Sequence, residues 1–290
     1  MPLDPEIVAY LELQKSLPPR SAMTLQQTRD RMIESAQRFG GAVLDVPLVR
    51  DITLGAVPVR EYRVATEPVV VYFHGGRFIS GGLASHDRVC RRLALAAHGT
   101  VLAVDYRLAP EHRFPAAVED ALAAVDWAIA QSDCVAVAGD SAGANLATVA
   151  AAARRTRVKC QVLIYPMIDA TRSLPSHVQF AEGWGPSSLD MQRGWDEYIP
   201  PGADPRDPRI SPSFSTEFAG LPPALVLTAE YDSLRDEGES YGFLMAKAGN
   251  CVEIKKYAGA IHGFITLAGS IGMAREAIEY VGEYLVNHTK

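Results

Sequence analysis

The sequence contains no run of apolar residues as long as the roughly 20 that a membrane-spanning helix requires. Its first ten residues, MPLDPEIVAY, carry acidic residues and prolines where a secretory signal has a basic start and an apolar core. We therefore expect a cytoplasmic protein without stable membrane insertion.

Basic clusters are scarce as well. The formal net charge is −6, and the densest group of cations, Arg154, Arg155 and Arg157, is short. A protein whose main partner is nucleic acid or an anionic membrane surface usually presents a larger basic patch. We expect neither partner, and we interpret the three arginines as a solvated helix end.

Cysteine is rare, and the four residues of this type are Cys90, Cys134, Cys160 and Cys251. They form no C-x-x-C pair, and no Cys/His cluster has the spacing of metal ligands. This pattern indicates no disulfide framework and no metal site. We expect buried free thiols.

Apolar residues, in contrast, make up 48% of the 290 residues, enough for a sizeable core in one large α/β domain or two small ones. Two β-rich runs, Val46–Leu54 and Val57–Val64, meet at Gly55 and are typical of an antiparallel pair. Later apolar runs alternate with helical patterns, which predicts a parallel, doubly wound sheet. We expect these later strands at Val69–Phe73, Val101–Val104, Val135–Ala138, Val162–Ile164, Leu225–Thr228 and Val252–Tyr257, and the helices at Arg88–Ala97, Ala116–Ala130, Ala142–Arg155, Glu237–Ala248 and Met273–Val286.

Residues 1–44 precede this alternation and have a helical pattern. The segment Pro5–Leu17 places Ile7, Val8 and Leu11 on one face, and Thr24 with Gln27 is typical of a capping box before a second helix. The apolar stripes need a surface to cover. Two interpretations stay open, a helical brace on the main domain and part of a lid over a pocket.

A second segment, residues 170–221, interrupts the alternation. It is rich in Pro, Gly, Ser and aromatic residues, with a short helix expected at Ser188–Tyr198, and it is too long for an ordinary loop. One interpretation is an excursion packed on the domain surface. The interpretation that we favour is the second half of a lid whose aromatic side chains line an apolar pocket. The aromatic residues in question are Trp184, Trp195, Tyr198 and Phe214.

A serine sits at the point where one predicted strand turns into a helix. In Gly139-Asp140-Ser141-Ala142-Gly143 the pattern G-x-S-x-G places Ser141 at a strained apex, and the flanking glycines avoid clashes with the crowded backbone. A serine hydroxyl is a weak nucleophile near neutral pH, so the chemistry needs a base and a group that orients the base.

Candidates for both partners follow later strands. His262, in GAIHGF, comes just after the last predicted strand, where open α/β sheets place their sites. Asp232 follows the strand before it, and Glu230 is the next choice for the acid. Asp236 and Glu237 begin a helix, where the helix dipole is sufficient explanation for acidic residues. The order Ser141, Asp232, His262 is that of α/β-hydrolase triads.

Acyl transfer also needs fixed donors for a developing oxyanion. The turn HGGRF, which starts at His74 and follows a predicted strand, has glycines at Gly75 and Gly76 that let the backbone approach a substrate. We expect N–H groups of this turn to form the oxyanion hole. The N–H of Ala142, directly after the serine, is expected to complete it.

Together these residues resemble the hormone-sensitive-lipase family of α/β-hydrolases. The resemblance extends from about Val69 to Phe264 through five stretches, which are HGG at His74–Gly76, DYRLAPEHRFPAAVED at Asp105–Asp120, GDSAGAN at Gly139–Asn145, EYDSLRDEG at Glu230–Gly238 and HGF at His262–Phe264. It implies an eight-stranded, mostly parallel sheet in residues 45–290. It also implies a cap built from residues 1–44 and an insertion at about 170–221, and ester hydrolysis without a cofactor.

The same resemblance implies roles for single residues. Ser141 would be the nucleophile, Asp232 the orienting acid and His262 the base, with Gly75, Gly76 and Ala142 around the oxyanion. The chain departs from the family at Arg77, where a third glycine is common. A backbone N–H survives this replacement, but the turn geometry and the direction of the cationic side chain do not follow from the sequence.

The sequence thus predicts a serine carboxylesterase that hydrolyses short- to medium-chain acyl esters through an acyl-enzyme. A non-catalytic receptor on the same fold is an alternative, because the family includes plant hormone receptors in which the catalytic histidine is replaced. Here His262 is intact. An amidase or peptidase with the same triad is a further alternative, since the acyl chemistry is shared. A homodimer is also left open.

Overall fold

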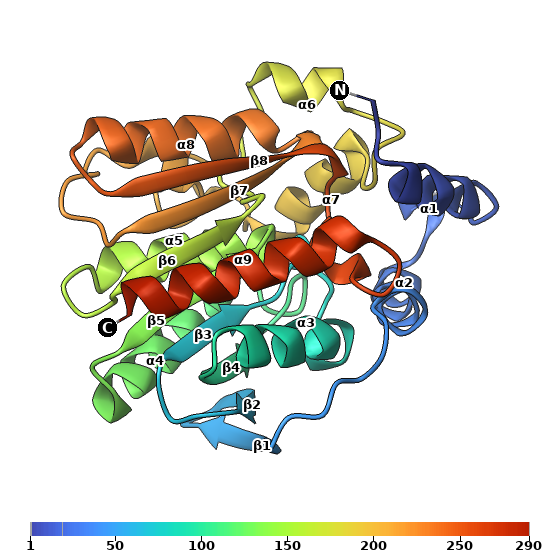
Figure 1. The fold of residues 1–290 in the computed structure, drawn as a ribbon. Coiled ribbons are helices and arrows are strands. Elements are labelled where there is room, and N and C mark those ends of the chain that lie inside the picture. Colours follow the sequence, from blue (N-terminus) through green and yellow to red (C-terminus); the bar gives the residue numbers. More distant parts are fainter. Residues whose placement is uncertain (1, 19, 290) are drawn as a thin grey trace.

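The computed structural model describes residues 2–18 and 20–289, and the strands among them form one twisted sheet with the order β1-β2-β4-β3-β5-β6-β7-β8 (Figure 1). β2 pairs antiparallel with β1 and β4, and the other neighbours are parallel. The predicted α/β-hydrolase architecture, with its antiparallel first pair, is confirmed. The strands are β1 Leu48–Leu54, β2 Val57–Arg63, β3 Val69–Phe73, β4 Thr100–Val104, β5 Val135–Asp140, β6 Cys160–Ile164, β7 Ala224–Tyr231 and β8 Val252–Ile261.

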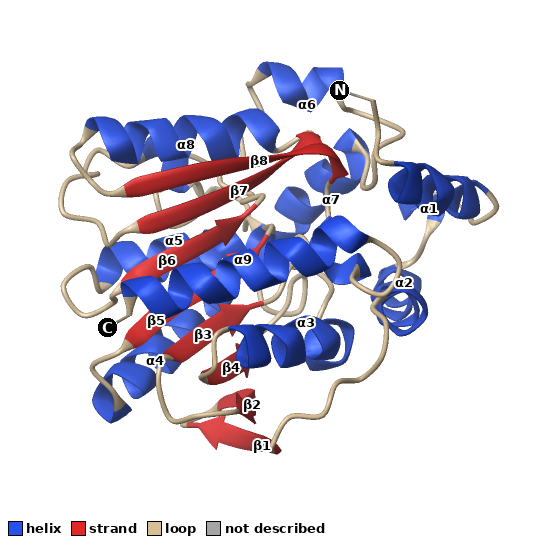
Figure 2. Ribbon diagram, viewed as in Figure 1, coloured by secondary structure: helices blue, strands red, loops and turns tan. Residues whose placement is uncertain are grey.

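Helices cover both faces of the sheet, with α3 and α9 on the near face in Figure 2 and α4, α5 and α8 on the other. Each face has its own apolar core, because β3, β5 and β6 are buried throughout and carry mostly apolar side chains on both sides. No helix in the described ranges is long and apolar enough to cross a membrane. The helices are α1 Pro5–Lys15, α2 Leu25–Phe39, α3 Leu83–Ala96, α4 Ala116–Gln131, α5 Ala142–Ala153, α6 Pro175–Gln179, α7 Ser188–Tyr198, α8 Arg235–Lys247 and α9 Gly272–His288, with short 3₁₀ turns η1 Arg20–Ala22, η2 Pro212–Phe214 and η3 Phe264–Leu267.

Some boundaries differ from those predicted. α3 begins at Leu83 rather than Arg88, because its first turns carry Ser85 and His86, polar residues that are buried and that an apolar pattern does not detect. The cysteines are free, but Cys251 is exposed and Cys134 half-buried, so the expectation of burial holds only for the other two.

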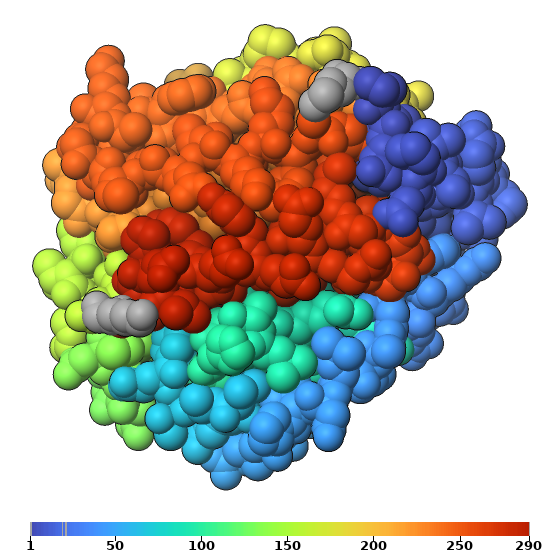
Figure 3. All heavy atoms as spheres, in the orientation of Figure 1, coloured from blue at the N-terminus to red at the C-terminus, as the bar shows by residue number. Residues whose placement is uncertain are grey.

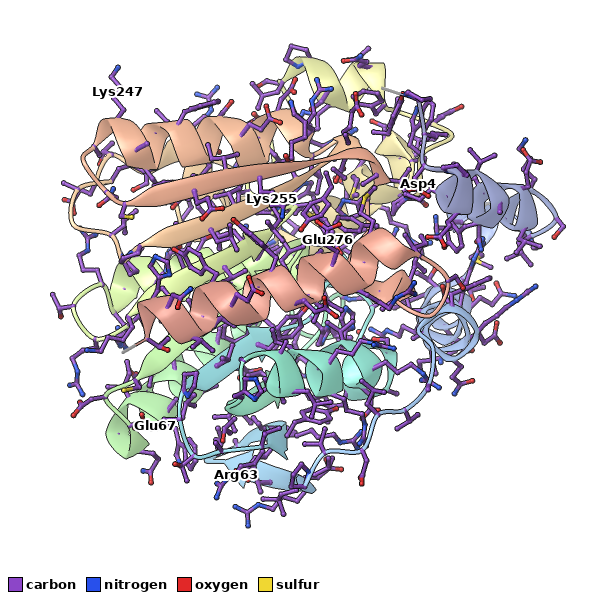
Figure 4. All side chains as sticks on the ribbon, in the orientation of Figure 1. Asp4, Arg63, Glu67, Lys247, Lys255 and Glu276 are labelled. Atoms are coloured by element: carbon purple, nitrogen blue, oxygen red, sulfur yellow. The ribbon has the colours of Figure 1, made fainter. Side chains whose placement is uncertain are left out.

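The N-terminal helices pack against the C-terminal part of the chain, as the blue and red surfaces in Figure 3 show. The capping box of Thr24 with Gln27 at the start of α2 is confirmed. In α1, Ile7 is buried but Val8 is 41% exposed, so the predicted apolar face was wrong at Val8. Asp4, labelled in Figure 4, caps α1 and donates its backbone N–H to the Gly259 carbonyl oxygen of β8 (3.2 Å).

Helix α6 lies in the long insertion and is attached to α8 by buried polar contacts. The Asp236 carboxylate accepts the Ser176 N–H (2.9 Å), and His177 Nε2 lies 3.1 Å from the Glu237 carboxylate, which also accepts the Ile168 N–H (2.7 Å). Burial raises the pKa of Glu237 to about 7 despite these contacts. Burial would lower the pKa of His177, but the Glu237 contact raises it. The first turn of α8 therefore does more than complement the helix dipole.

Because the pKa of the buried Glu237 is raised, we expect the stability of the protein to depend on pH. Between its unfolded pKa of 4.5 and its folded pKa of about 7, Glu237 binds a proton in the folded chain that the unfolded chain has released. Its contribution to the unfolding free energy therefore falls as the pH rises. A pKa raised from 4.5 to about 7 corresponds to roughly 3 kcal/mol. We therefore expect the Tm of Glu237→Gln, relative to the parent, to rise by about 5 °C between about pH 5 and pH 8. Thermal unfolding across this range measures it.

The matched control is Glu239→Gln, the same change on the same helix at a half-buried residue that pairs with Lys256 (3.0 Å). Its Tm relative to the parent is expected to stay constant between about pH 5 and pH 8. Parallel curves for the parent and Glu237→Gln would contradict the prediction.

Candidate active site

Ser141 occupies the turn between β5 and α5, at the edge where the parallel strands end. Its φ of 56° and ψ of −119° are strained for a residue with a side chain. A Cβ at Gly139 would collide with the backbone of Gly143, and a Cβ at Gly143 would collide with the carbonyl oxygen of Phe73. The expectation that this crowded turn needs both glycines is confirmed.

Ser141, His262 and Asp232 form a continuous chain of hydrogen bonds. His262 Nε2 lies 3.0 Å from Ser141 Oγ, and His262 Nδ1 lies 2.7 Å from Asp232 Oδ2. The second oxygen of the fully buried Asp232 accepts the N–H of Leu234 (2.8 Å). Because an ionised carboxylate only accepts, Nδ1 carries the ring proton and Nε2 is free to accept the serine proton. The arrangement is suited to proton abstraction from Ser141.

The competing acidic residues lie elsewhere. Glu230, the second choice for the acid, accepts the N–H of Gly259 (2.8 Å), and Asp236 and Glu237 contact α6 and the loop after β6. Of these four acids, only Asp232 contacts His262. Within the described residues, no three His, Cys, Asp or Glu side chains are placed to hold a metal ion.

The turn after β3 has left-handed backbone at Gly76 (φ 137°), Arg77 (φ 59°) and Phe78 (φ 63°). The Gly75 N–H donates to Asp140 Oδ1 (2.9 Å) and is therefore not available to an oxyanion, which differs from the sequence expectation. Among the described residues, no acceptor takes the N–H of Gly76 or Arg77. These two groups and the N–H of Ala142, the first residue of α5, are among the donors that the geometry leaves free.

Asp140 anchors this turn and was missed by the sequence reasoning. Besides the Gly75 N–H, its Oδ1 accepts the Tyr72 hydroxyl (2.8 Å) and lies 3.2 Å from His86 Nε2. Burial alone would raise the pKa of Asp140, but the contacts with His86, Tyr72 and Gly75 hold it below its usual value. Burial and the neighbouring His86 lower the pKa of His74 to about 3, so His74 is neutral near pH 7. The sequence signal that could have identified Asp140 is an acidic residue at the second position of the G-x-S-x-G pattern.

Replacing Asp140 tests whether the turn must be anchored. We expect Asp140→Ala to lower kcat for a short ester by about 10- to 100-fold with little change in KM, because an oxyanion donor is displaced rather than removed. We expect Asp140→Asn to lose much less, since its amide oxygen can still accept from Gly75 and Tyr72. Steady-state kinetics of both variants make the measurement. Equal losses in the two would contradict the anchoring role.

A cavity opens beside Ser141 and His262, and its walls come from segments far apart in the sequence. α1 and α2 contribute Tyr10 and Met32, and the long insertion contributes Gly185 and Pro186. Both segments proposed as a lid therefore border the cavity. Whether they act as a lid stays a prediction.

The aromatic residues of the insertion do not line this cavity, so that expectation was wrong. Tyr198 stacks on Phe78 (ring centroids 3.8 Å apart), with Trp195 beside them, and Trp184 stacks on Tyr231 (4.7 Å). These side chains are large enough to bury much of the insertion against the sheet domain. They pack the insertion against the sheet domain, away from the lining of the cavity.

The Arg77 side chain, whose direction the sequence left open, is buried at the cavity wall. Its Nη1 donates to the Asp190 carbonyl oxygen (3.2 Å) and lies 3.8 Å from the Asp190 carboxylate. Helix α7 packs so closely on Arg77 that a Cβ at Gly194 would overlap it. Burial lowers the pKa of Arg77 to about 10, so it remains a cation at neutral pH.

Comparisons with known proteins agree with this geometry. A profile of the family described as alpha/beta hydrolase fold matches residues 70–266. The chain is 33% identical to an ethyl acetate hydrolase from Pseudomonas putida over 99% of this chain and 100% of the relative. It is 37% identical to the carboxylic ester hydrolase LipN from Mycobacterium tuberculosis over 80% and 68% of the two chains. It superposes on a hyperthermophilic esterase from Pyrobaculum calidifontis with a TM-score of 0.92 and 38% identity over 99% of both chains.

Proposed function

The chain belongs to the hormone-sensitive-lipase family of α/β-hydrolases, and from this membership we propose that it is a serine carboxylesterase acting on short- to medium-chain acyl esters. The observation that carries the proposal is the chain of hydrogen bonds from Ser141 through His262 to Asp232. Relatives of matching length support it, since one is named an ethyl acetate hydrolase and its substrate has a two-carbon acyl group.

In the first step, Ser141 Oγ attacks the ester carbonyl carbon while His262 Nε2 takes the hydroxyl proton. The carbonyl oxygen becomes an oxyanion and accepts hydrogen bonds from the free N–H groups of the turn and of Ala142. The proton then passes from His262 to the departing alkoxide, which leaves as the alcohol. Ser141 is left as an acyl ester.

In the second step, His262 takes a proton from water, and the resulting hydroxide attacks the acyl-enzyme carbonyl. Collapse of the tetrahedral intermediate returns the proton to Ser141 and releases the carboxylic acid. Asp232 holds the imidazole in the required tautomer and stabilises the imidazolium in both steps. The 2.7 Å contact between the two side chains supports this role.

A fluorophosphonate and a substrate panel test the proposal together. We expect the fluorophosphonate to label Ser141, and we expect turnover of 4-nitrophenyl esters to be highest for short and medium acyl groups. A chain that neither reacts with the probe nor cleaves any ester would be a receptor instead. Faster cleavage of matched anilides than of esters would indicate an amidase, and a maximum at long acyl chains would contradict the proposed substrate range.

The substrate is a small ester, and the net charge of −6 supports the absence of a nucleic-acid partner. We propose a cytoplasmic location. A homodimer would appear in size-exclusion chromatography with light scattering as twice the chain mass of 31.4 kDa.

A further inference from the structure

Three arginines from separate parts of the chain line the cavity that contains Ser141 and His262. Arg20 belongs to η1, Arg31 to α2 and Arg77 to the turn after β3. Arg77 is buried, and the other two are half-buried. A pocket for a neutral ester needs apolar surface and few polar groups. Three arginines in the wall of one ester site therefore need an explanation.

The arginines are close enough to repel one another. Burial lowers the pKa of Arg31, and the charge of Arg20 lowers it further, while Tyr10, Asp190 and Glu34 act in the opposite direction. Burial also lowers the pKa of Arg77, where Asp190 offsets part of the effect and the charge of Arg20 adds to it. Like charges gathered in one cavity reduce stability unless an anion joins them.

Carboxylates among the described residues form no close ion pair with Arg20 or Arg31. Arg31 donates to neutral acceptors, the side-chain oxygen of Gln14 (2.9 Å) and the carbonyl oxygen of Pro18 (2.8 Å). Among the described residues, no carboxylate is recorded within 4 Å of the guanidinium of Arg20 or Arg31.

Two acids beside the cavity or its arginines, Asp190 and Asp140, are already engaged. Asp190 lies 3.8 Å from Arg77, but its Oδ2 caps α7 by accepting from the backbone and hydroxyl of Ser187. Asp140 holds the Gly75 turn. The cavity therefore presents excess positive charge next to the nucleophile.

We infer that the preferred substrate is an ester that also carries a carboxylate, which Arg20, Arg31 and Arg77 attract while the ester carbonyl meets Ser141. The inference rests on the proposed esterase function and narrows its substrate class to half-esters of dicarboxylic acids and esters of small hydroxy acids. The planar guanidinium matches a carboxylate through paired hydrogen bonds, which are stronger in a partly buried site than in water.

Two pairs of esters, matched in size, test whether a carboxylate on the substrate increases the rate of cleavage. Monoethyl glutarate and its neutral amide, ethyl glutaramate, differ in the acyl half, and acetoxyacetate and acetoxyacetamide differ in the alcohol half. Each cleavage releases one acid equivalent, so a pH-stat measures kcat/KM for all four. We expect at least one carboxylate to exceed its amide by about tenfold, and added salt to reduce this ratio.

Variants identify the source of the preference. Arg31→Gln is expected to reduce the carboxylate-to-amide ratio by about fivefold or more, while Arg31→Lys keeps most of it because the charge is kept. Arg20→Gln is a second, independent variant on η1. The control is Arg38→Gln, which makes the same change on the exposed side of the same helix and should leave the ratio unaltered.

The outcomes separate the inference from the proposed function. If the parent cleaves none of the four esters and no 4-nitrophenyl ester, the esterase proposal fails. If it cleaves the neutral esters but neither pair shows a carboxylate preference, only the inference is overturned. A preference that Arg38→Gln reduces as much as Arg31→Gln and Arg20→Gln also overturns it, because the attraction would then come from the overall charge of the protein.

Discussion

Ser141→Ala is expected to lower kcat for a short ester by about 10⁴- to 10⁶-fold and to leave the fold intact. The hydroxyl is the atom that would form the acyl-enzyme, and the residual activity would come from the oxyanion donors acting on bound ester and water. The variant should fold because Ser141 Oγ makes its only recorded side-chain hydrogen bond, among the described residues, with His262, while the backbone contact with Ile164 is unaffected.

Two measurements on Ser141→Ala distinguish loss of the nucleophile from unfolding and from reaction at another serine. Circular dichroism and thermal unfolding should match those of the parent, since the strained backbone at this position accepts alanine as readily as serine. The fluorophosphonate should label the parent and fail to label the variant. Turnover close to that of the parent would remove Ser141 from the mechanism. Labelling of the variant at another serine would assign the nucleophile elsewhere.

The sequence predicted the parts of the site that follow from strand ends. Ser141, Asp232 and His262 each come within a few residues of the end of a predicted strand, and the carboxyl ends of neighbouring parallel strands meet at one edge of the sheet. β5, β7 and β8 are close together in the strand order, so residues separated by more than one hundred positions along the chain become hydrogen-bond partners. The pattern of predicted strands and the order of these three residues were enough to predict that they meet at one edge of the sheet.

What the sequence did not predict depends on contacts between side chains from different elements. The Gly75 N–H donates to the Asp140 carboxylate. This contact joins the ends of β3 and β5, and neither the HGG motif nor the G-x-S-x-G motif reveals it alone. The aromatic residues of the insertion follow no period, and Trp195 and Tyr198 meet Phe78 only because α7 lies across the turn. The short α6 is fixed by α8 instead of by its own residues, since a five-residue helix has little intrinsic stability.

Asp232→Asn, compared with Glu230→Gln, is the second change with a large expected effect. Both exchange a carboxylate for an amide at the end of β7, two residues apart. An amide at position 232 can donate to Nδ1 of His262 and so favour the tautomer whose Nε2 carries the proton and does not accept one from Ser141. We expect kcat to fall about 10⁴-fold, as in other triads with this change.

For Glu230→Gln we expect kcat within about twofold of the parent, because the amide oxygen can still accept the Gly259 N–H. Kinetics with one short ester and thermal unfolding of both variants make the comparison, and Asp232→Asn should stay folded since its amide oxygen can accept from Leu234.

The reverse pattern, a large loss in Glu230→Gln alone, would mean that the catalytic acid reaches His262 only after the end of β7 rearranges. Comparable losses in both would mean that the strand end acts as one unit. A loss confined to Asp232→Asn is the result that the 2.7 Å contact requires, because that contact alone sets the tautomer of the base.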